Sequence, residues 1–171
     1  MQNANEITLR LVIVDDSAEH AEALVSALRN SGIAVRPHRP TNSSELAAIL
    51  DSQTVDLVMA AEQQSLDWTL VSQQAGASGK DIPVILLVQE LDETRLVEAM
   101  SGGIRAVALR KRPEHVLAVA RNEFTDLQAR RGLRRIEAQM RETERRCDAL
   151  IASSREPIAY IHEGMHIRAN D

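Results

Sequence analysis

Two adjacent carboxylates, Asp15 and Asp16, are the side chains of this sequence best placed to do chemistry. They follow directly after the apolar run 11–14, Leu-Val-Ile-Val. A short run rich in β-branched residues is typical of a strand buried on both faces in a parallel sheet. Ligands bind at the carboxyl ends of such strands. Paired acids there serve a divalent cation or a phosphoryl group, so neighbouring strands must supply the remaining groups.

The composition excludes several classes of protein. The 171 residues allow one domain and an appendage, and 44% of them are hydrophobic but only 2% aromatic, which predicts an aliphatic core. A net charge of −5 gives no general attraction to nucleic acid or an anionic membrane. The single cysteine, Cys147, suits a reducing cytosol, and no apolar run approaches the roughly 20 residues that span a bilayer. We expect a cytoplasmic protein with a disordered N-terminus over residues 1–8.

Strand-like and helical patterns alternate five times with short connections, which predicts a parallel sheet with helices on both faces. The fold class is therefore α/β, flavodoxin-like (βα)5, with strand order 2-1-3-4-5 and an extended C-terminal helix. The second strand contains Pro37 and belongs at the sheet edge, because proline has no N–H for a ladder. In the helix over 92–101, we expect Leu96, Val97 and Met100 to face inward.

Residues 9–122 resemble a response-regulator receiver domain of two-component signalling. In that family an acid pair after the first strand holds Mg²⁺, and an aspartate ending the third strand accepts a phosphoryl group. A Ser or Thr ending the fourth strand and a Lys after the fifth contact the phosphoryl oxygens. The matching segments are Val12-Ile13-Val14-Asp15-Asp16, Val55-Asp56-Leu57-Val58-Met59, Pro83-Val84-Ile85-Leu86-Leu87 and Gly102-Gly103-Ile104.

The resemblance implies a degenerate phosphorylation pocket. The acceptor position is Ala61, which has no nucleophilic carboxylate, and the hydroxyl position is Val88, which cannot donate to phosphate. We therefore expect a receiver that is not an enzyme, with no metal or cofactor and no Mg²⁺, and an acid paired with Lys111 or Arg112. The five positions of the pocket are Asp15, Asp16, Ala61, Val88 and Lys111.

Two alternatives remain open for this pocket. A displaced acid, Glu62 or Asp56, could serve as a phosphoacceptor, although a shift of one residue along a strand re-aims the side chain. The pocket could instead take a small ligand or an ion.

The helix that begins at Pro113 continues to about residue 153, longer than a receiver needs, and residues 123–153 form a predicted signalling helix. Its apolar positions alternate in steps of four and three, the 3.5-residue repeat of a two-stranded coiled coil. Interleaved arginines and acids suit a solvated helix beside a dimer seam and disfavour nucleic-acid binding. The predicted seam residues are Leu133, Ile136, Met140, Cys147 and Leu150, with Ala129 and Thr143 as weaker members.

Residues 154–171 resemble the start of a truncated PAS domain, with strands flanking a hairpin turn at Glu163-Gly164. The order receiver, signalling helix, PAS is similar to the N-terminal part of cyclic-di-GMP (GGDEF/EAL) proteins of the FimX type, which regulate type IV pili and twitching motility. This resemblance implies a homodimer that helps to localise a longer protein, including to a cell pole. It also implies the pilus assembly ATPase or other pilus regulators as partners.

Overall fold

The computed structural model describes residues 8–153, 159–162 and 165–169. The chain divides into two compact units, Met1–Leu127 and Gln128–Asp171.

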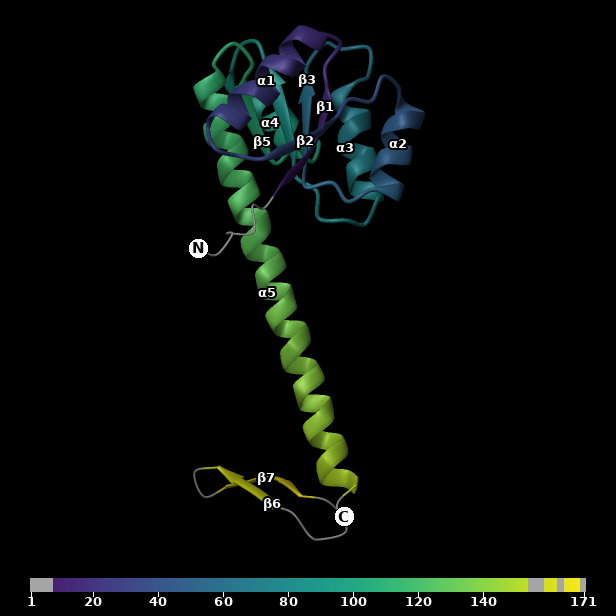
Figure 1. Cartoon of the computed structure of the whole chain (residues 1–171), viewed down its shortest axis with the longest axis vertical. Coiled ribbons are helices and arrows are strands. Elements are labelled where there is room, and N and C mark those ends of the chain that lie inside the picture. Colours follow the sequence, from purple (N-terminus) through teal and green to yellow (C-terminus); the bar gives the residue numbers. More distant parts are fainter. Residues whose placement is uncertain (1–7, 154–158, 163–164, 170–171) are drawn as a thin grey trace. The chain divides into compact units, whose positions relative to one another are not determined.

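The first unit contains one parallel sheet of five strands in the order β2-β1-β3-β4-β5, which confirms the predicted topology (Figure 1). Because the strands are parallel, their carboxyl ends meet at one edge of the sheet. The strands are β1 (Leu9–Val14), β2 (Val35–His38), β3 (Leu57–Ala61), β4 (Val84–Val88) and β5 (Ala106–Leu109).

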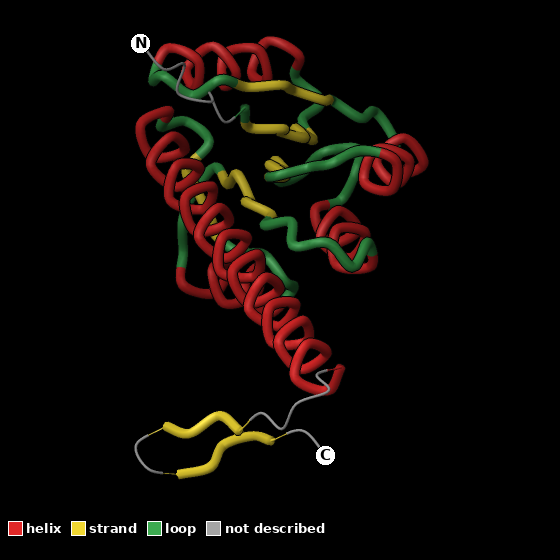
Figure 2. Tube along the Cα trace, turned by 60° about the horizontal axis from the view of Figure 1, so that its bottom comes forward, coloured by secondary structure: helices red, strands yellow, loops and turns green. Residues whose placement is uncertain are grey.

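Helices cover both faces of the sheet. Helices α1 and α5 pack on one face, and α2, α3 and α4 pack on the other; Figure 2 shows α1 and the α2–α3 pair on opposite sides of the strands. Side chains at the N-caps of α1 to α4 accept backbone N–H bonds of the first turns, which explains where these helices begin. The helices are α1 (Ala18–Asn30), α2 (Ser43–Ser52), α3 (Trp68–Ala77), α4 (Glu93–Ser101) and α5 (Pro113–Ser153).

Strand β1 lies at the centre of an aliphatic core. Leu11 and Ile13 belong to the cluster beneath α1 and α5, whereas Val12 and Val14 belong to the cluster beneath α2, α3 and α4. All four side chains are at most 2% exposed. Burial of alternate residues on opposite faces explains the continuous apolar run in the sequence.

Strand β2 occupies an edge, as its proline predicted. The N–H of Leu9 donates to the carbonyl of Ala34 over 2.8 Å, so the peptide groups of Val35 and Pro37 face away from β1. Proline thus lacks its N–H where the sheet has no further strand. Nη2 of Arg29 also donates to the outward carbonyl of Val35 over 3.2 Å. Both features protect this edge against pairing with another strand.

The prediction for α4 was wrong. Among its residues only Ala99 is buried, whereas Leu96, Val97 and Met100 are 36%, 59% and 59% exposed. The helix approaches the sheet through the small side chain of Ala99, so its larger apolar side chains lie on the outer face. Helical periodicity locates an apolar stripe but does not say what covers it.

Helix α5 passes through Gly132 without interruption and enters the second unit. Val116, Ala120 and Leu127 are its buried residues. The second unit also contains a two-stranded antiparallel hairpin of β6 (Ala159–His162) and β7 (Met165–Ala169), which confirms the predicted hairpin. The expected turn at Glu163-Gly164 lies outside the described residues. No helix in the described part of the chain is long and apolar enough to cross a bilayer.

A buried carboxylate ties β3 to the start of β1. Asp56 is 0% exposed, and it accepts hydrogen bonds from the backbone N, Nε and Nη2 of Arg10 over 2.8–2.9 Å. The side-chain hydrogen bond to Asp56 raises the pKa of Arg10 above its ordinary value.

We expect Asp56→Ala to lower the free energy of unfolding by about 2 kcal/mol, because it leaves the N–H groups of Arg10 without their acceptor. Urea denaturation followed by the fluorescence of Trp68, the single tryptophan, measures this loss. Asp51→Ala is the control, since Asp51 is exposed on α2. Equal unfolding midpoints for the two variants would contradict a structural role for Asp56.

Candidate functional site

The carboxyl ends of β1, β3 and β4 bring three of the predicted pocket positions to one edge of the sheet. Register pairs Val14 with Ala60, and Ala61 with Leu87, so the strands end side by side. Asp15 is 4% exposed, Ala61 1% and Val88 0%. The methyl group of Ala61 packs in the cluster beneath α1 and α5, and the isopropyl group of Val88 packs in the cluster beneath α2, α3 and α4.

The cation that reaches this carboxylate is Arg110. Its Nη2 lies 2.7 Å from Oδ1 and 2.8 Å from Oδ2 of Asp15. Arg110 follows β5 directly, and its backbone N–H donates to the carbonyl of Val88 over 2.8 Å, which fixes the start of its side chain. Lys111, the predicted candidate, is exposed. Residues 110–112 are Arg-Lys-Arg, and nothing in the sequence indicates which of these three cations faces inward.

His20, which the sequence analysis missed, is the second partner of Asp15. Nδ1 of His20 lies 2.6 Å from Oδ2 of Asp15 and 3.4 Å from Nε of Arg110. The backbone N–H of Ser17 donates to Oδ1 over 2.9 Å. Asp15 thus joins the end of β1 to the first turn of α1 and to the segment after β5. The available signal was a histidine in the first turn of the predicted helix, five residues beyond Asp15.

Asp16 has different partners. Its carboxylate accepts hydrogen bonds from the backbone N–H and the hydroxyl of Ser65 over 2.8 and 2.6 Å. These bonds lower the pKa of Asp16 below its ordinary value. The stabilisation is therefore present above the ordinary pKa and is lost as the pH falls through the lowered one. Arg39 donates to the backbone carbonyls of Asp15 and Asp16, each over 3.0 Å, and holds the pair from outside.

The two acids considered as displaced phosphoacceptors are both engaged. Glu62 is 6% exposed; its Oε1 accepts the backbone N–H of Gln89 over 2.9 Å, and its Oε2 pairs with Arg95 of α4. Glu62 therefore links the end of β3 to α4. Asp56 precedes β3 at the opposite end of the strand, where it holds Arg10.

The acids do not gather into a metal site. Among the described residues, no group of three or more His, Cys, Asp or Glu side chains is placed to hold a metal ion. The guanidinium of Arg110 lies against Asp15, where the receiver pattern places a divalent cation. The arrangement can neutralise a buried carboxylate and fix three chain segments, but it offers no nucleophile at Ala61.

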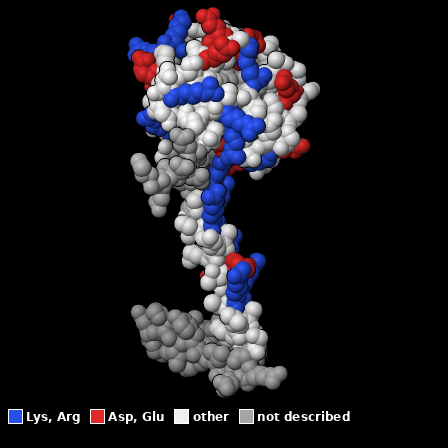
Figure 3. All heavy atoms as spheres, in the orientation of Figure 1, with Lys and Arg blue, Asp and Glu red and all other residues white. Residues whose placement is uncertain are grey.

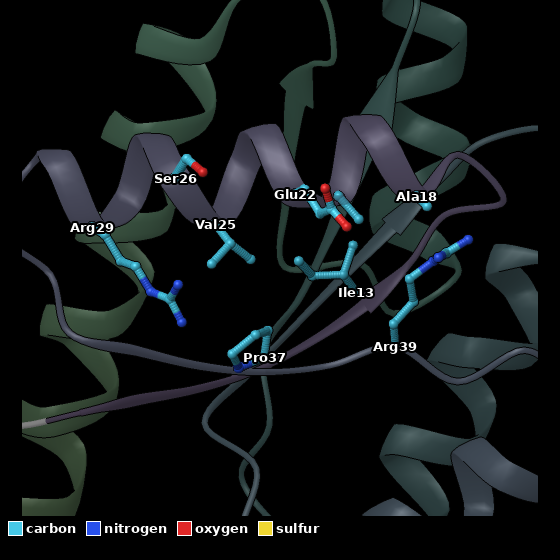
Figure 4. Close-up of a pocket in the computed structure, with 9 residues that line it drawn as sticks. Ile13, Ala18, Glu22, Val25, Ser26, Arg29, Pro37 and Arg39 are labelled. Atoms are coloured by element: carbon cyan, nitrogen blue, oxygen red, sulfur yellow. The ribbon is translucent and has the colours of Figure 1, made fainter.

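A groove of about 420 Å³ adjoins this site between α1 and β2. Figure 4 shows Ile13 and Val25 above Pro37, with Arg29 and Arg39 toward the two ends. Both arginines donate to backbone carbonyls, Arg29 to Val35 and Arg39 to the acid pair. Their guanidinium groups therefore stabilise the walls of the groove.

The predicted seam residues of α5 are exposed in the single chain. The exposed fractions are 58% for Leu133, 56% for Ile136, 59% for Met140 and 70% for Leu150, and Cys147 is a free, exposed thiol. Figure 3 shows arginine side chains along α5, with acids among them. Apolar side chains at coiled-coil spacing thus have no cover from the described residues of their own chain.

We expect Arg110→Ala to lower the free energy of unfolding by about 3 kcal/mol, because it leaves the buried carboxylate of Asp15 without its guanidinium. Denaturant titration measures the loss. The adjacent substitution Lys111→Ala is the control, and an exposed lysine should cost no more than about 0.5 kcal/mol. Similar losses in the two variants would show that Arg110 does not hold Asp15.

A scan against protein-family models and a comparison with curated proteins gave no match. Solved structures do match. A CheY-like receiver domain from Methanospirillum hungatei JF-1 is 15% identical, with a TM-score of 0.61, over 72% of this chain and 98% of that chain. The receiver domain of an HD domain-containing protein from Pseudomonas fluorescens Pf-5 is 18% identical, with a TM-score of 0.61, over 71% and 98%.

A third match extends further along the chain. It is a fusion that contains the trimeric coiled coil of yeast Spc42, with 14% identity and a TM-score of 0.63 over 84% of this chain and 96% of that chain. At these identities the likeness is one of fold. The chain has the flavodoxin-like fold of CheY-like receiver domains, with a long C-terminal helix.

Proposed function

We propose that this chain is a signalling receiver that is not phosphorylated and that acts by binding protein chains, a second copy of itself first. The observation that carries the proposal is the contact of the Arg110 guanidinium with both carboxylate oxygens of Asp15. An internal cation takes the place of the divalent ion that phosphoryl transfer requires.

Phosphoryl transfer depends on positioning and on cations that neutralise the developing charge of the phosphoryl group. The nucleophile would have to come from Ala61, which has none, and a hydrogen bond from Val88, which cannot donate. Glu62 has both oxygens engaged by Gln89 and Arg95. These contacts support a pocket that stabilises the fold and carries no phosphoryl group.

Incubation of the chain with acetyl phosphate and Mg²⁺, followed by intact-mass analysis, tests this part of the proposal. We expect no gain in mass, because no carboxylate is free at the carboxyl end of β3. A receiver domain that retains the acceptor aspartate, incubated in parallel, shows that the reagent is active. A gain of one phosphoryl group that disappears in Glu62→Gln would instead favour the displaced acid.

Dimerisation through α5 is the second part of the proposal. Leu133, Ile136 and Met140 are each more than half exposed, and their spacing of three and four residues forms one stripe. Burying such a stripe against an identical helix removes apolar surface from water at roughly 25 cal/mol per Å². The match to a coiled-coil fusion supports an oligomer without fixing the number of chains.

We expect Ile136→Asp with Met140→Asp to convert a dimer into a monomer, since both changes place charge in the seam. Sedimentation velocity at high micromolar concentration measures the distribution. Ala138→Asp is the matched control, because residue 138 is exposed and lies on the helix face opposite the seam. A wild-type monomer, or a dimer that survives the double substitution, would contradict a seam on α5.

The resemblance of the whole arrangement to FimX-type cyclic-di-GMP proteins supports a more specific role. We propose that the module helps to dimerise and localise such a protein in the cytoplasm, including at a cell pole, in the control of type IV pili and twitching motility. The pilus assembly ATPase or another pilus regulator is then the expected partner. Loss of polar localisation in the double seam variant, with the control unchanged, tests this role in cells.

A further inference from the structure

A second polar site lies at the opposite end of the sheet from Asp15. It is an open cavity of about 300 Å³ lined by Arg10, Arg36, His38, Gln53 and Thr54. Arg10 is the second residue of β1, Arg36 and His38 belong to the edge strand β2 (Figure 1), and Gln53 and Thr54 follow α2. All five residues belong to the first compact unit.

Strand register gathers the cations of this site on one face. Register pairs Arg10 with Arg36, and Val12 with His38. Val12 packs into the cluster that contains Leu46, Ile49 and Leu50 of α2. Because side chains alternate along a strand, Arg10, Arg36 and His38 share the face of the sheet that α2 covers.

The charges of the two arginines are balanced differently. Arg10 is neutralised by Asp56, whose carboxylate accepts three N–H groups of that residue. Arg36 is exposed, and within the described residues its side chain has no ion pair or hydrogen bond. The charge of Arg36 is therefore the one that an anion in this cavity would neutralise.

The remaining groups of the cavity also favour an anion. The guanidinium groups of Arg10 and Arg36 donate only, and Gln53 and Thr54 add neutral donors. The ammonium of Lys80 lies beside the cavity, 3.2 Å from the carbonyl oxygen of Gln53. The nearest buried acid, Asp56, is already occupied by Arg10 and is 0% exposed.

We propose that this cavity binds the phosphate group of a small ligand, with Arg36 as the principal cation and with His38, Thr54 and Arg10 as further donors. Donors from two strands and one loop surround the cavity, which suits a tetrahedral oxyanion with several oxygens better than a planar carboxylate with two. Arginine provides the fork of N–H groups that binds phosphate in a bidentate manner. The site is independent of the proposed function, since it shares no residue with the Asp15 pocket or the α5 seam.

Titration with inorganic phosphate and with glycerol phosphate, at constant ionic strength and followed by ¹H–¹⁵N spectra of the whole chain, tests the proposal. We expect saturable shifts centred on the amides of Arg36, His38, Gln53 and Thr54. Tighter binding of glycerol phosphate indicates a phosphorylated organic ligand, and equal binding indicates the free ion. Either result supports a phosphate site.

Two variants that lose the same charge separate a specific site from general attraction. We expect Arg36→Gln to weaken phosphate binding at least tenfold. Lys111→Gln removes an exposed cation after β5 and should leave the affinity unchanged. The absence of saturable shifts, or an equal loss of affinity in both variants, would overturn the proposal. Spectra that are otherwise native confirm that each variant is folded.

Discussion

The contact between Asp15 and Arg110 is the interaction on which the arrangement of the sheet edge depends. Asp15 follows the interior strand β1, and its side chain is 0% exposed in the ion pair. A buried carboxylate is costly unless a cation and hydrogen bonds compensate it. Arg110, His20 and the N–H of Ser17 supply that compensation from three different segments. The end of β1, the first turn of α1 and the segment before α5 are therefore fixed together.

Apolar side chains occupy two positions at this edge where a phosphoryl site would need polar ones. Ala61 and Val88 extend the aliphatic core to the ends of β3 and β4, where a phosphoryl site would need polar groups. A second ion pair, between Glu62 and Arg95, holds α4 against the same edge. At this edge of the sheet, arginine thus holds a buried acid at two places. Helices α4 and α5 both expose large apolar side chains, and under the proposed function these are the surfaces available to a partner.

The sequence was sufficient for the fold but only partly for the site. Continuous apolar strands, a proline in the second strand and regular alternation with helices determine the strand order, because few parallel topologies satisfy them. The sequence also predicted that Asp15, Ala61 and Val88 lie at the carboxyl edge of the sheet, since each residue ends a strand or directly follows one. The choice of Arg110 over Lys111 did not follow, because neighbouring residues in a turn can point in any direction.

The side-chain partners of the buried acids were the part of the site that the sequence did not predict. His20 contacts Asp15 through the geometry of the first helical turn, and Arg95 reaches Glu62 across 33 residues of sequence. For α4, periodicity correctly grouped Val97 and Met100 but assigned their stripe to the wrong side. The reason is physical: a helix needs only one small buried residue, here Ala99, to pack against a sheet, and its remaining apolar residues can face outward.

Isothermal titration of the chain with Mg²⁺ tests the central claim most directly. If the guanidinium of Arg110 takes the place of the divalent ion, titration produces no saturable heat in the wild-type protein, and Asp15→Ala gives the same trace. Saturable binding of Mg²⁺ to the wild-type chain that Asp15→Ala abolishes would contradict the account, because it would show that the acid pair still holds a metal ion.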